Sequence, residues 1–184
     1  FDDADLERAA AAAPGAVFDN AGQDCCARSR LLVQRSVYDR FLELLEPAVA
    51  AWRVGDPTRG DVDMGPLISA GHRDGVASFL DGANVAFRGS APTGAEAGDG
   101  FWFAPAVVLA APGDRVAQDE VFGPIVAVLP FDDEADAIRL ANDTIYGLAG
   151  SIWTENLGRA VRVSRGVRSG VLSVNSHSSV RYWA

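Results

Sequence analysis

Two adjacent cysteines, Cys25 and Cys26, have the clearest potential for covalent chemistry in this chain. They are its only cysteines and end a short polar segment, Gly-Gln-Asp-Cys-Cys, that follows an alanine-rich stretch. A cysteine in such a turn is placed to react, because its thiolate is a strong nucleophile. The alternative is that both are small buried side chains, as is common for free cysteine. The flanking residues and a second motif favour the nucleophile.

The charges beside Cys25 act in opposite directions. A free thiol has a pKa near ~8.5, so a nucleophilic cysteine needs its thiolate favoured. Asp24 would raise the pKa of Cys25 if it is ionised and close, whereas Arg28 and nearby backbone N–H groups would offset it. The sequence leaves open which effect prevails.

The second informative segment, Gln118 to Ile125, contains Glu120 and Phe122 just before a Gly-Pro turn and a run of apolar residues. In isolation, Glu120 is as well explained by a solvated loop carboxylate, with Phe122 anchoring the turn. The segment gains meaning from its order relative to other motifs.

Five motifs occur in one order between Gly22 and Asn175. They are Gly22-Gln-x-Cys25, Met64-Gly-Pro-Leu-Ile-Ser69, Glu120-Val-Phe-Gly-Pro124, Asn142-Asp-Thr-x-Tyr-Gly-Leu-Ala-Gly150 and Gly170-Val-Leu-Ser-Val-Asn175. This series resembles the aldehyde dehydrogenase superfamily. Several motifs in a fixed order are far more specific than any one of them, so the resemblance is strong.

The resemblance implies a reaction and a role for several residues. Cys25 would attack an aldehyde to give a thiohemiacetal, hydride would pass to NAD or NADP, and water would hydrolyse the resulting thioester. The oxyanion would be held by the Cys25 backbone N–H and a side-chain amide from elsewhere. Glu120 would bind the nicotinamide ribose and Phe122 would pack on the nicotinamide. The residues that match the aldehyde pocket are Asp24, Cys26, His177 and Val180, and those that would shape the surrounding loops are Asn20, Gly22, Gln23 and Asn175.

The resemblance also implies what lies outside residues 1–184. Family members are more than twice this length, and their dinucleotide-binding domain, general-base glutamate, oxyanion asparagine and cofactor-binding lysine would precede Phe1. An oligomerisation tail would follow Ala184. We therefore expect residues 1–184 to be the catalytic domain, lacking most of the cofactor site and unable to turn over alone. The complete protein would be a homodimer or tetramer, and the choice between NAD and NADP lies in the missing domain.

Hydrophobic patterning predicts an α/β fold, a mainly parallel sheet with helices on both faces. The expected helices are 5–13 (broken or kinked by Pro14-Gly15), 37–52, 69–80, one through residue 142 that is capped by Asp132-Asp133, and 155–165. The expected strands are 30–34, 85–87, 101–110 (an edge strand or two pieces, because of Pro105), 125–131, 148–153 and 170–174.

Composition excludes several classes of function. The net charge of −9 disfavours nucleic acid and anionic membranes, and no apolar run is long enough to span a bilayer. All sixteen basic residues are arginine, so lysine Schiff-base chemistry is excluded within this chain. No Cys/His cluster has the spacing of a metal site, and we expect no metal. Free thiols indicate a reducing compartment, most simply the cytoplasm.

Two other functions remain open. Cys25, Asn175 and His177 follow the order of a Cys-His-Asn hydrolase, although the local signature of papain-like enzymes is absent. An isolated scaffold or interaction module is the non-catalytic alternative. Within the resemblance, the segment from Ser173 to Tyr182 is similar to members acting on amino-aldehydes, and Asp24 could attract a cationic substrate. His72 is expected to be a plain surface residue.

Overall fold

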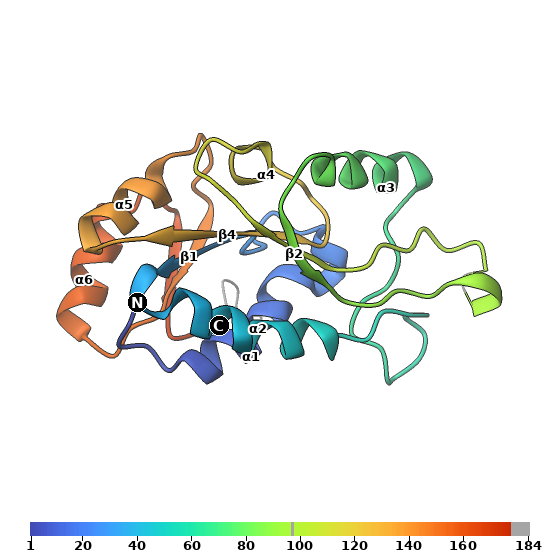
Figure 1. The fold of residues 1–184 in the computed structure, drawn as a ribbon, viewed down its shortest axis with the longest axis horizontal. Coiled ribbons are helices and arrows are strands. Elements are labelled where there is room, and N and C mark those ends of the chain that lie inside the picture. The colour runs from blue at the N-terminus through green and yellow to red at the C-terminus, as the bar shows by residue number, and fades with distance from the viewer. Residues whose placement is uncertain (97, 178–184) are drawn as a thin grey trace.

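The computed structural model describes residues 1–96 and 98–177, and helices lie on both sides of a central sheet (Figure 1). The helices are α1 (Leu6–Phe18), α2 (Tyr38–Ala50), α3 (Ala70–Ala77), α4 (Arg115–Gln118), α5 (Glu134–Asn142) and α6 (Leu157–Gly166). The strands are β1 (Arg30–Gln34), β2 (Val85–Arg88), β3 (Ala106–Leu109), β4 (Ile125–Phe131), β5 (Ala149–Ile152) and β6 (Val171–Val174). Short 3₁₀ helices occupy Asp19–Gly22, Arg35–Val37, Ser78–Leu80 and Gly94–Glu96.

The strands form two sheets. The larger has the order β1-β4-β3-β2, in which β4 runs parallel to β1 and β3, whereas β2 is antiparallel to β3. The smaller sheet is the parallel pair of β5 and β6. The expected α/β fold with mainly parallel pairing is confirmed.

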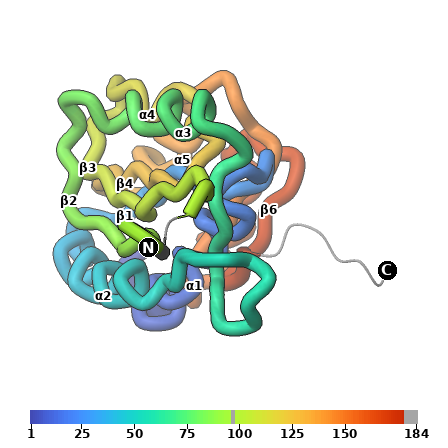
Figure 2. Tube along the Cα trace, turned by 90° about the vertical axis from the view of Figure 1, so that its right-hand side faces the viewer, coloured from blue at the N-terminus to red at the C-terminus, as the bar shows by residue number. Residues whose placement is uncertain are grey.

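The main core lies within three layers, with the larger sheet between two layers of helices. Helices α1 and α2 cover one face of the larger sheet, and α3 and α4 lie over the other (Figures 1 and 2). The central strand β4 is buried on both faces, with Ile125, Ala127 and Val128 fully inaccessible. Burial on both faces explains its unbroken apolar run, which is typical of parallel sheets.

Two expectations about proline were wrong in part. Helix α1 continues through Pro14, although Pro14-Gly15 was expected to break or kink it. The face containing Ala10 and Val17 is buried in the core, and we attribute the continuity of the helix to this packing. Strand β3 is not an edge strand, because it lies between β4 and β2. Pro105 immediately precedes it, a position where no ladder N–H is needed.

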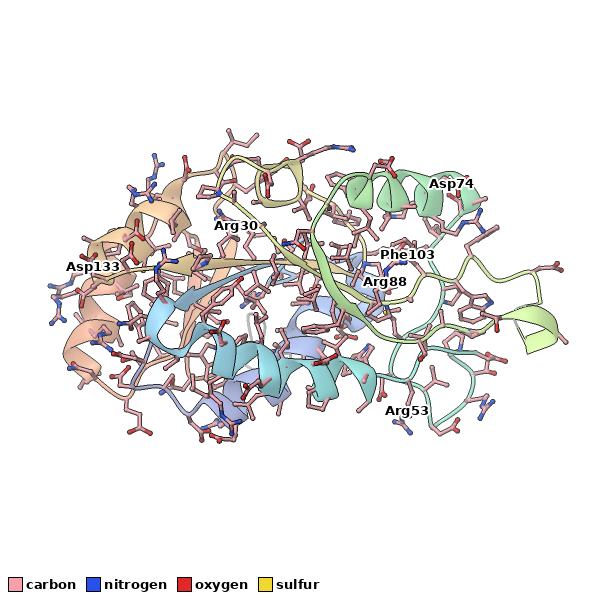
Figure 3. The ribbon with its side chains drawn as sticks, viewed as in Figure 1. Arg30, Arg53, Asp74, Arg88, Phe103 and Asp133 are labelled. Carbon is pink, nitrogen blue, oxygen red and sulfur yellow. The ribbon has the colours of Figure 1, made fainter. Side chains whose placement is uncertain are left out.

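Side chains fix α5 to the end of the larger sheet. Asp133 caps the helix by accepting the Asp136 N–H, as the sequence predicts. At the other end, the Arg30 guanidinium donates to the carbonyls of Leu140 and Ala141, which a helix C-terminus leaves without intrahelical partners. Figure 3 labels Arg30, which joins β1 to the C-terminal end of α5, and Asp133, which caps the other end of that helix.

One edge of β1 and one edge of β5 border the same cavity. Within residues 1–96 and 98–177, β1 pairs only with β4, and β5 pairs only with β6. Residues of both strands line a cavity of about 490 Å³. Backbone groups along these two edges therefore lack sheet partners in the part of the chain that the structure describes.

The helices among the described residues are too short or too polar for any of them to span a membrane.

Candidate active site

The two cysteines follow a tight turn at the end of α1. Asn20, Ala21 and Gly22 all have positive φ, at 50°, 57° and 68°. The Asn20 side chain donates to the Gln23 carbonyl at 2.9 Å, and the Gln23 side chain donates back to the Asn20 carbonyl at 3.2 Å. These reciprocal hydrogen bonds hold an unusual backbone in place. We call residues 20–26 the nucleophile turn.

Cys25 is exposed and Cys26 is half-buried, and their Sγ atoms lie 4.0 Å apart. The Cys26 N–H donates to the Asp24 carboxylate at 2.9 Å. The Ala27 N–H donates to the Asp24 carbonyl at 3.1 Å. By contrast, the Cys25 N–H has no acceptor among residues 1–96 and 98–177. It is therefore available to an oxygen that approaches Cys25 Sγ.

The environment raises the pKa of the Cys25 thiol. The largest cause is the neighbouring Cys26 thiol, and the negative charge of Asp24 acts in the same direction. Arg28 does not offset them. Its guanidinium is almost buried, donates to the Cys26 carbonyl, and donates from Nε to Ser151 Oγ at 3.2 Å. The balance that the sequence left open is thus decided in favour of the protonated thiol.

Glu120 and Phe122 lie on the segment between α4 and β4. The Glu120 N–H donates to the Tyr146 hydroxyl at 3.4 Å, and the Glu120 side chain is exposed. Phe122 has a positive φ of 55°, and 38% of its surface is exposed. An aromatic residue with this backbone and this exposure is unusual, and such conformations concentrate at functional sites.

The 490 Å³ cavity brings most of the predicted site residues together. Its lining includes Asp24, Cys25, Glu120, Phe122 and His177, which come from three distant parts of the sequence. Cys26 is not among the residues that line it. Val180 lies outside the described residues.

The structure provides no support for a Cys-His-Asn hydrolase. The Asn175 amide oxygen accepts the Thr154 N–H at 3.1 Å, and its amide nitrogen donates to the Thr154 carbonyl at 3.0 Å. In a Cys-His-Asn arrangement the asparagine orients the histidine. Here the Asn175 amide is instead hydrogen-bonded to the backbone of Thr154, just after β5. Asn175 thereby holds the segment that follows β5 against the end of β6.

His72 was wrongly expected to be a plain surface residue. It is half-buried in the first turn of α3, and its Nε2 lies 2.8 Å from the Phe122 carbonyl oxygen. Tyr146 was also missed, although it stands inside a motif that the sequence analysis singled out. No pattern around His72 signals its partner, because the two residues are 50 positions apart.

One group of potential metal ligands is present among the described residues. Ligand atoms of Asp24, Cys25 and Cys26 lie within 4.8 Å of one another. Their closeness follows from their being consecutive in one turn. The expectation of no metal stays a prediction.

Comparison with known proteins identifies the family. The model of the aldehyde dehydrogenase family matches residues 1–182. The chain is 43% identical over 183 residues to 2-aminomuconic 6-semialdehyde dehydrogenase of Pseudomonas sp, covering 96% of this chain and 37% of that protein. It is 40% identical over 181 residues to betaine aldehyde dehydrogenase of Bacillus subtilis strain 168, covering 95% and 37%.

The solved structures agree. Betaine aldehyde dehydrogenase of Staphylococcus aureus, crystallised in complex with NAD+, superposes with a TM-score of 0.94 at 39% identity, covering 100% of this chain and 38% of that one. The chain therefore spans less than two fifths of the length of these relatives. The match extends over nearly all of residues 1–184, and the chain belongs to the aldehyde dehydrogenase family.

Proposed function

We propose that the complete protein oxidises an aldehyde to a carboxylate with NAD or NADP as oxidant, and that residues 1–184 form its catalytic domain. The observation that carries the proposal is the cavity that Cys25 shares with Glu120 and Phe122. Membership of the aldehyde dehydrogenase family supports the reaction class, and an NAD+ complex of the Staphylococcus aureus relative supports the cofactor.

Cys25 is the nucleophile in this proposal. Its thiolate adds to the aldehyde carbon, and the carbonyl oxygen gains a proton or a hydrogen bond as the thiohemiacetal forms. The raised pKa of Cys25 means that a base must first remove the thiol proton. We place that base in the part of the complete protein outside this chain, as the resemblance implies. Loss of a hydride from the thiohemiacetal carbon leaves a thioester on Cys25, which water then hydrolyses to release the carboxylate and the free thiol.

The residues at the cavity rim fit a nicotinamide cofactor. Phe122 offers a partly exposed aromatic ring for packing against a flat ring, and Glu120 offers an exposed carboxylate that can accept hydrogen bonds from ribose hydroxyls. The chemistry that NAD or NADP supplies when bound is acceptance of a hydride, which leaves the thioester on Cys25. The remainder of the cofactor site would belong to a dinucleotide-binding domain outside this chain.

The Cys25 N–H fits the role of an oxyanion donor. It lacks an acceptor among residues 1–96 and 98–177, and it belongs to the same residue as the attacking sulfur. A donor left free in this way stabilises negative charge on the substrate oxygen without first giving up another hydrogen bond. A second donor, a side-chain amide, would come from outside the chain.

The unpaired edges of β1 and β5 support an incomplete domain. Both edges border one cavity, and a strand placed between them would join the two sheets. We infer that residues of the complete protein outside 1–184 supply it. For this reason, and because most of the cofactor site lies elsewhere, we expect the isolated chain to lack turnover. The complete protein would be a homodimer or tetramer in a reducing compartment such as the cytoplasm.

An amino-aldehyde is the substrate class we favour. Asp24 is exposed, lines the cavity and stands next to Cys25, so its charge would attract a cationic group. Relatives named for betaine aldehyde support a cationic substrate. Relatives named for muconic semialdehydes are the competing precedent, and those substrates carry carboxylates.

The deciding experiment uses the complete protein. We expect NAD(P)+-dependent oxidation of aldehydes, loss of that oxidation in Cys25→Ala, and recovery of an acyl adduct on Cys25 by mass spectrometry after acid quenching. Cys26→Ala serves as the matched thiol variant, in which the adduct should still form on Cys25. Absence of both turnover and adduct in the unmodified protein would favour the non-catalytic module instead.

Substrate class is tested by a matched series. A trimethylammonium aldehyde, its uncharged isostere and a carboxylated aldehyde of equal length are compared by kcat/KM. We expect the cationic compound to be preferred and Asp24→Asn to reduce that preference by about five- to ten-fold. Preference for the carboxylated compound would instead assign the chain to the semialdehyde group.

A further inference from the structure

We propose that His72 is a positioning residue, which holds Phe122 at the cavity rim by binding its backbone carbonyl. The inference rests on the proposed function, in which Phe122 packs against the nicotinamide. It adds a residue from α3 that the family resemblance did not assign.

The Phe122 backbone requires support from outside itself. Its φ of 55° is in the left-handed region, which side chains with a Cβ rarely adopt. The next residue, Gly123, has no room for a side chain, because a Cβ there would lie 2.6 Å from Val76 Cγ2. Phe122 and Gly123, which we call the Phe122 turn, therefore lie directly against α3. The conformation of this turn depends on its contacts with α3.

His72 makes a defined polar contact from α3 to this turn. Nε2 of His72 lies 2.8 Å from the Phe122 carbonyl oxygen. A carbonyl oxygen can only accept, so Nε2 carries the proton and donates. The position of His72 is itself fixed, because its backbone N–H donates to the Oγ of Ser69, the N-cap of α3, at 3.1 Å.

The same end of α3 is tied to the nucleophile turn. The Ile68 N–H, just before the helix, donates to Gln23 Oε1 at 3.0 Å. Gln23 in turn donates to the Asn20 carbonyl. Ile68, just before α3, thus contacts the turn that contains Cys25, and His72, in the first turn of α3, contacts the turn that contains Phe122.

A third contact joins the nucleophile turn directly to the Phe122 turn. Gly22 of the nucleophile turn packs so tightly on the Phe122 turn that a Cβ at Gly22 would collide with the Gly123 carbonyl group. The nucleophile turn, the start of α3 and the Phe122 turn therefore form a ring of contacts. In this ring His72 sets the orientation of the Phe122 backbone relative to Cys25.

The test measures the complete protein with His72→Phe, which removes the donor, and His72→Gln, whose side-chain amide can donate in its place. We expect His72→Phe to raise the KM for NAD(P)+ about three- to ten-fold, the range for loss of one hydrogen bond, with kcat for the aldehyde changed by less than about two-fold. His72→Gln should recover most of the loss. Arg73→Gln, the adjacent position in α3, is the matched control because its guanidinium pairs with Asp74 instead.

Hydrogen exchange provides the second measurement. His72→Phe should speed amide exchange in the peptide that spans Val121 to Ile125, and leave exchange in α6 as it is. Faster exchange with an unchanged cofactor KM would show a purely structural role and overturn the inference, as would no change in either measurement. A complete protein that oxidises no aldehyde would defeat the proposed function itself, and that outcome is visible before any variant is made.

Discussion

The Sγ atoms of Cys25 and Cys26 lie 4.0 Å apart, within hydrogen-bonding reach and well beyond a disulfide bond. The Cys25 thiol can share its proton with Cys26 in a hydrogen bond, and ionising Cys25 would give up that bond and place a second negative charge near Asp24. This is why the pKa of Cys25 is raised, with Cys26 as the largest cause. The neighbours of the nucleophile keep it protonated until a base acts on it.

The first prediction concerns the pH dependence of alkylation. The rate of reaction of Cys25 with iodoacetamide should rise through a midpoint above that of an ordinary thiol, because only the thiolate reacts. Cys26→Ser should lower the midpoint, and Asp24→Asn should lower it by less. The rate is followed by peptide mass spectrometry from pH 6 to 11. A midpoint that Cys26→Ser leaves in place would refute this account of the shift.

The raised pKa of Cys25 also determines how the stability of the fold changes with pH. A raised pKa in the folded state means that the folded protein holds the Cys25 proton more tightly than the unfolded chain does. The stabilisation from this proton is complete below the ordinary thiol pKa and is lost as pH rises through the raised value. Cys25→Ser should therefore flatten the alkaline fall in the free energy of unfolding.

The second prediction concerns close packing at Gly22. Gly22 and Gly82 both have positive φ, at 68° and 72°, but only at Gly22 would a Cβ meet backbone atoms. Gly82→Ala should cost only the left-handed strain, about 1–2 kcal/mol. Gly22→Ala should cost clearly more and also slow alkylation of Cys25. Urea unfolding measures both, and equal losses would show that the Gly22–Gly123 contact can relax.

The third prediction concerns Arg28, which connects the nucleophile turn to β5 through the Cys26 carbonyl and Ser151 Oγ. Arg28→Met keeps much of the side-chain volume and removes the donors, so the half-buried Cys26 carbonyl loses this donor and Ser151 Oγ keeps, among the described residues, only its hydrogen bond with Ser173 Oγ. We expect a loss of about 1–3 kcal/mol in the free energy of unfolding. Ser151→Ala, which removes one of these hydrogen bonds, should cost less. A loss in Arg28→Met no larger than in Ser151→Ala would contradict the bridging role.

The fourth prediction is a stabilising change. Gly75 lies in the exposed middle of α3, and a Cβ there would meet nothing within 4 Å. Gly75→Ala should stabilise the protein by about 0.5–1 kcal/mol, because alanine has the higher helix propensity. Gly166→Ala, at the end of α6, is the contrasting variant, since its Cβ would lie 2.8 Å from Ile138 Cδ1. Thermal unfolding of both variants separates helix propensity from available space.

The sequence predicted the individual helices and strands better than it predicted which elements lie next to one another. The strand at residues 125–131 and the helix cap at Asp133 were predicted correctly, because apolar runs and cap residues act over a few positions. The edge position expected for β3 was wrong, because β3 pairs with both β4 and β2. Strand order depends on such pairing between separate segments, which the residues of β3 alone do not specify. Helix α1 was expected to end or kink at Pro14, but burial of its core face outweighs the local cost of proline.

The sequence by itself determined the family, the α/β class and the choice of Cys25 as the candidate nucleophile, because ordered motifs and local periodicity are written in neighbouring residues. Only the tertiary structure decided that Arg28 turns toward Ser151, that Cys25 shares a cavity with Glu120 and Phe122, and that His72 reaches the Phe122 carbonyl. These relationships join segments that lie 50 or more positions apart. They depend on how the helices and sheets pack, and no local pattern of residue types specifies that packing.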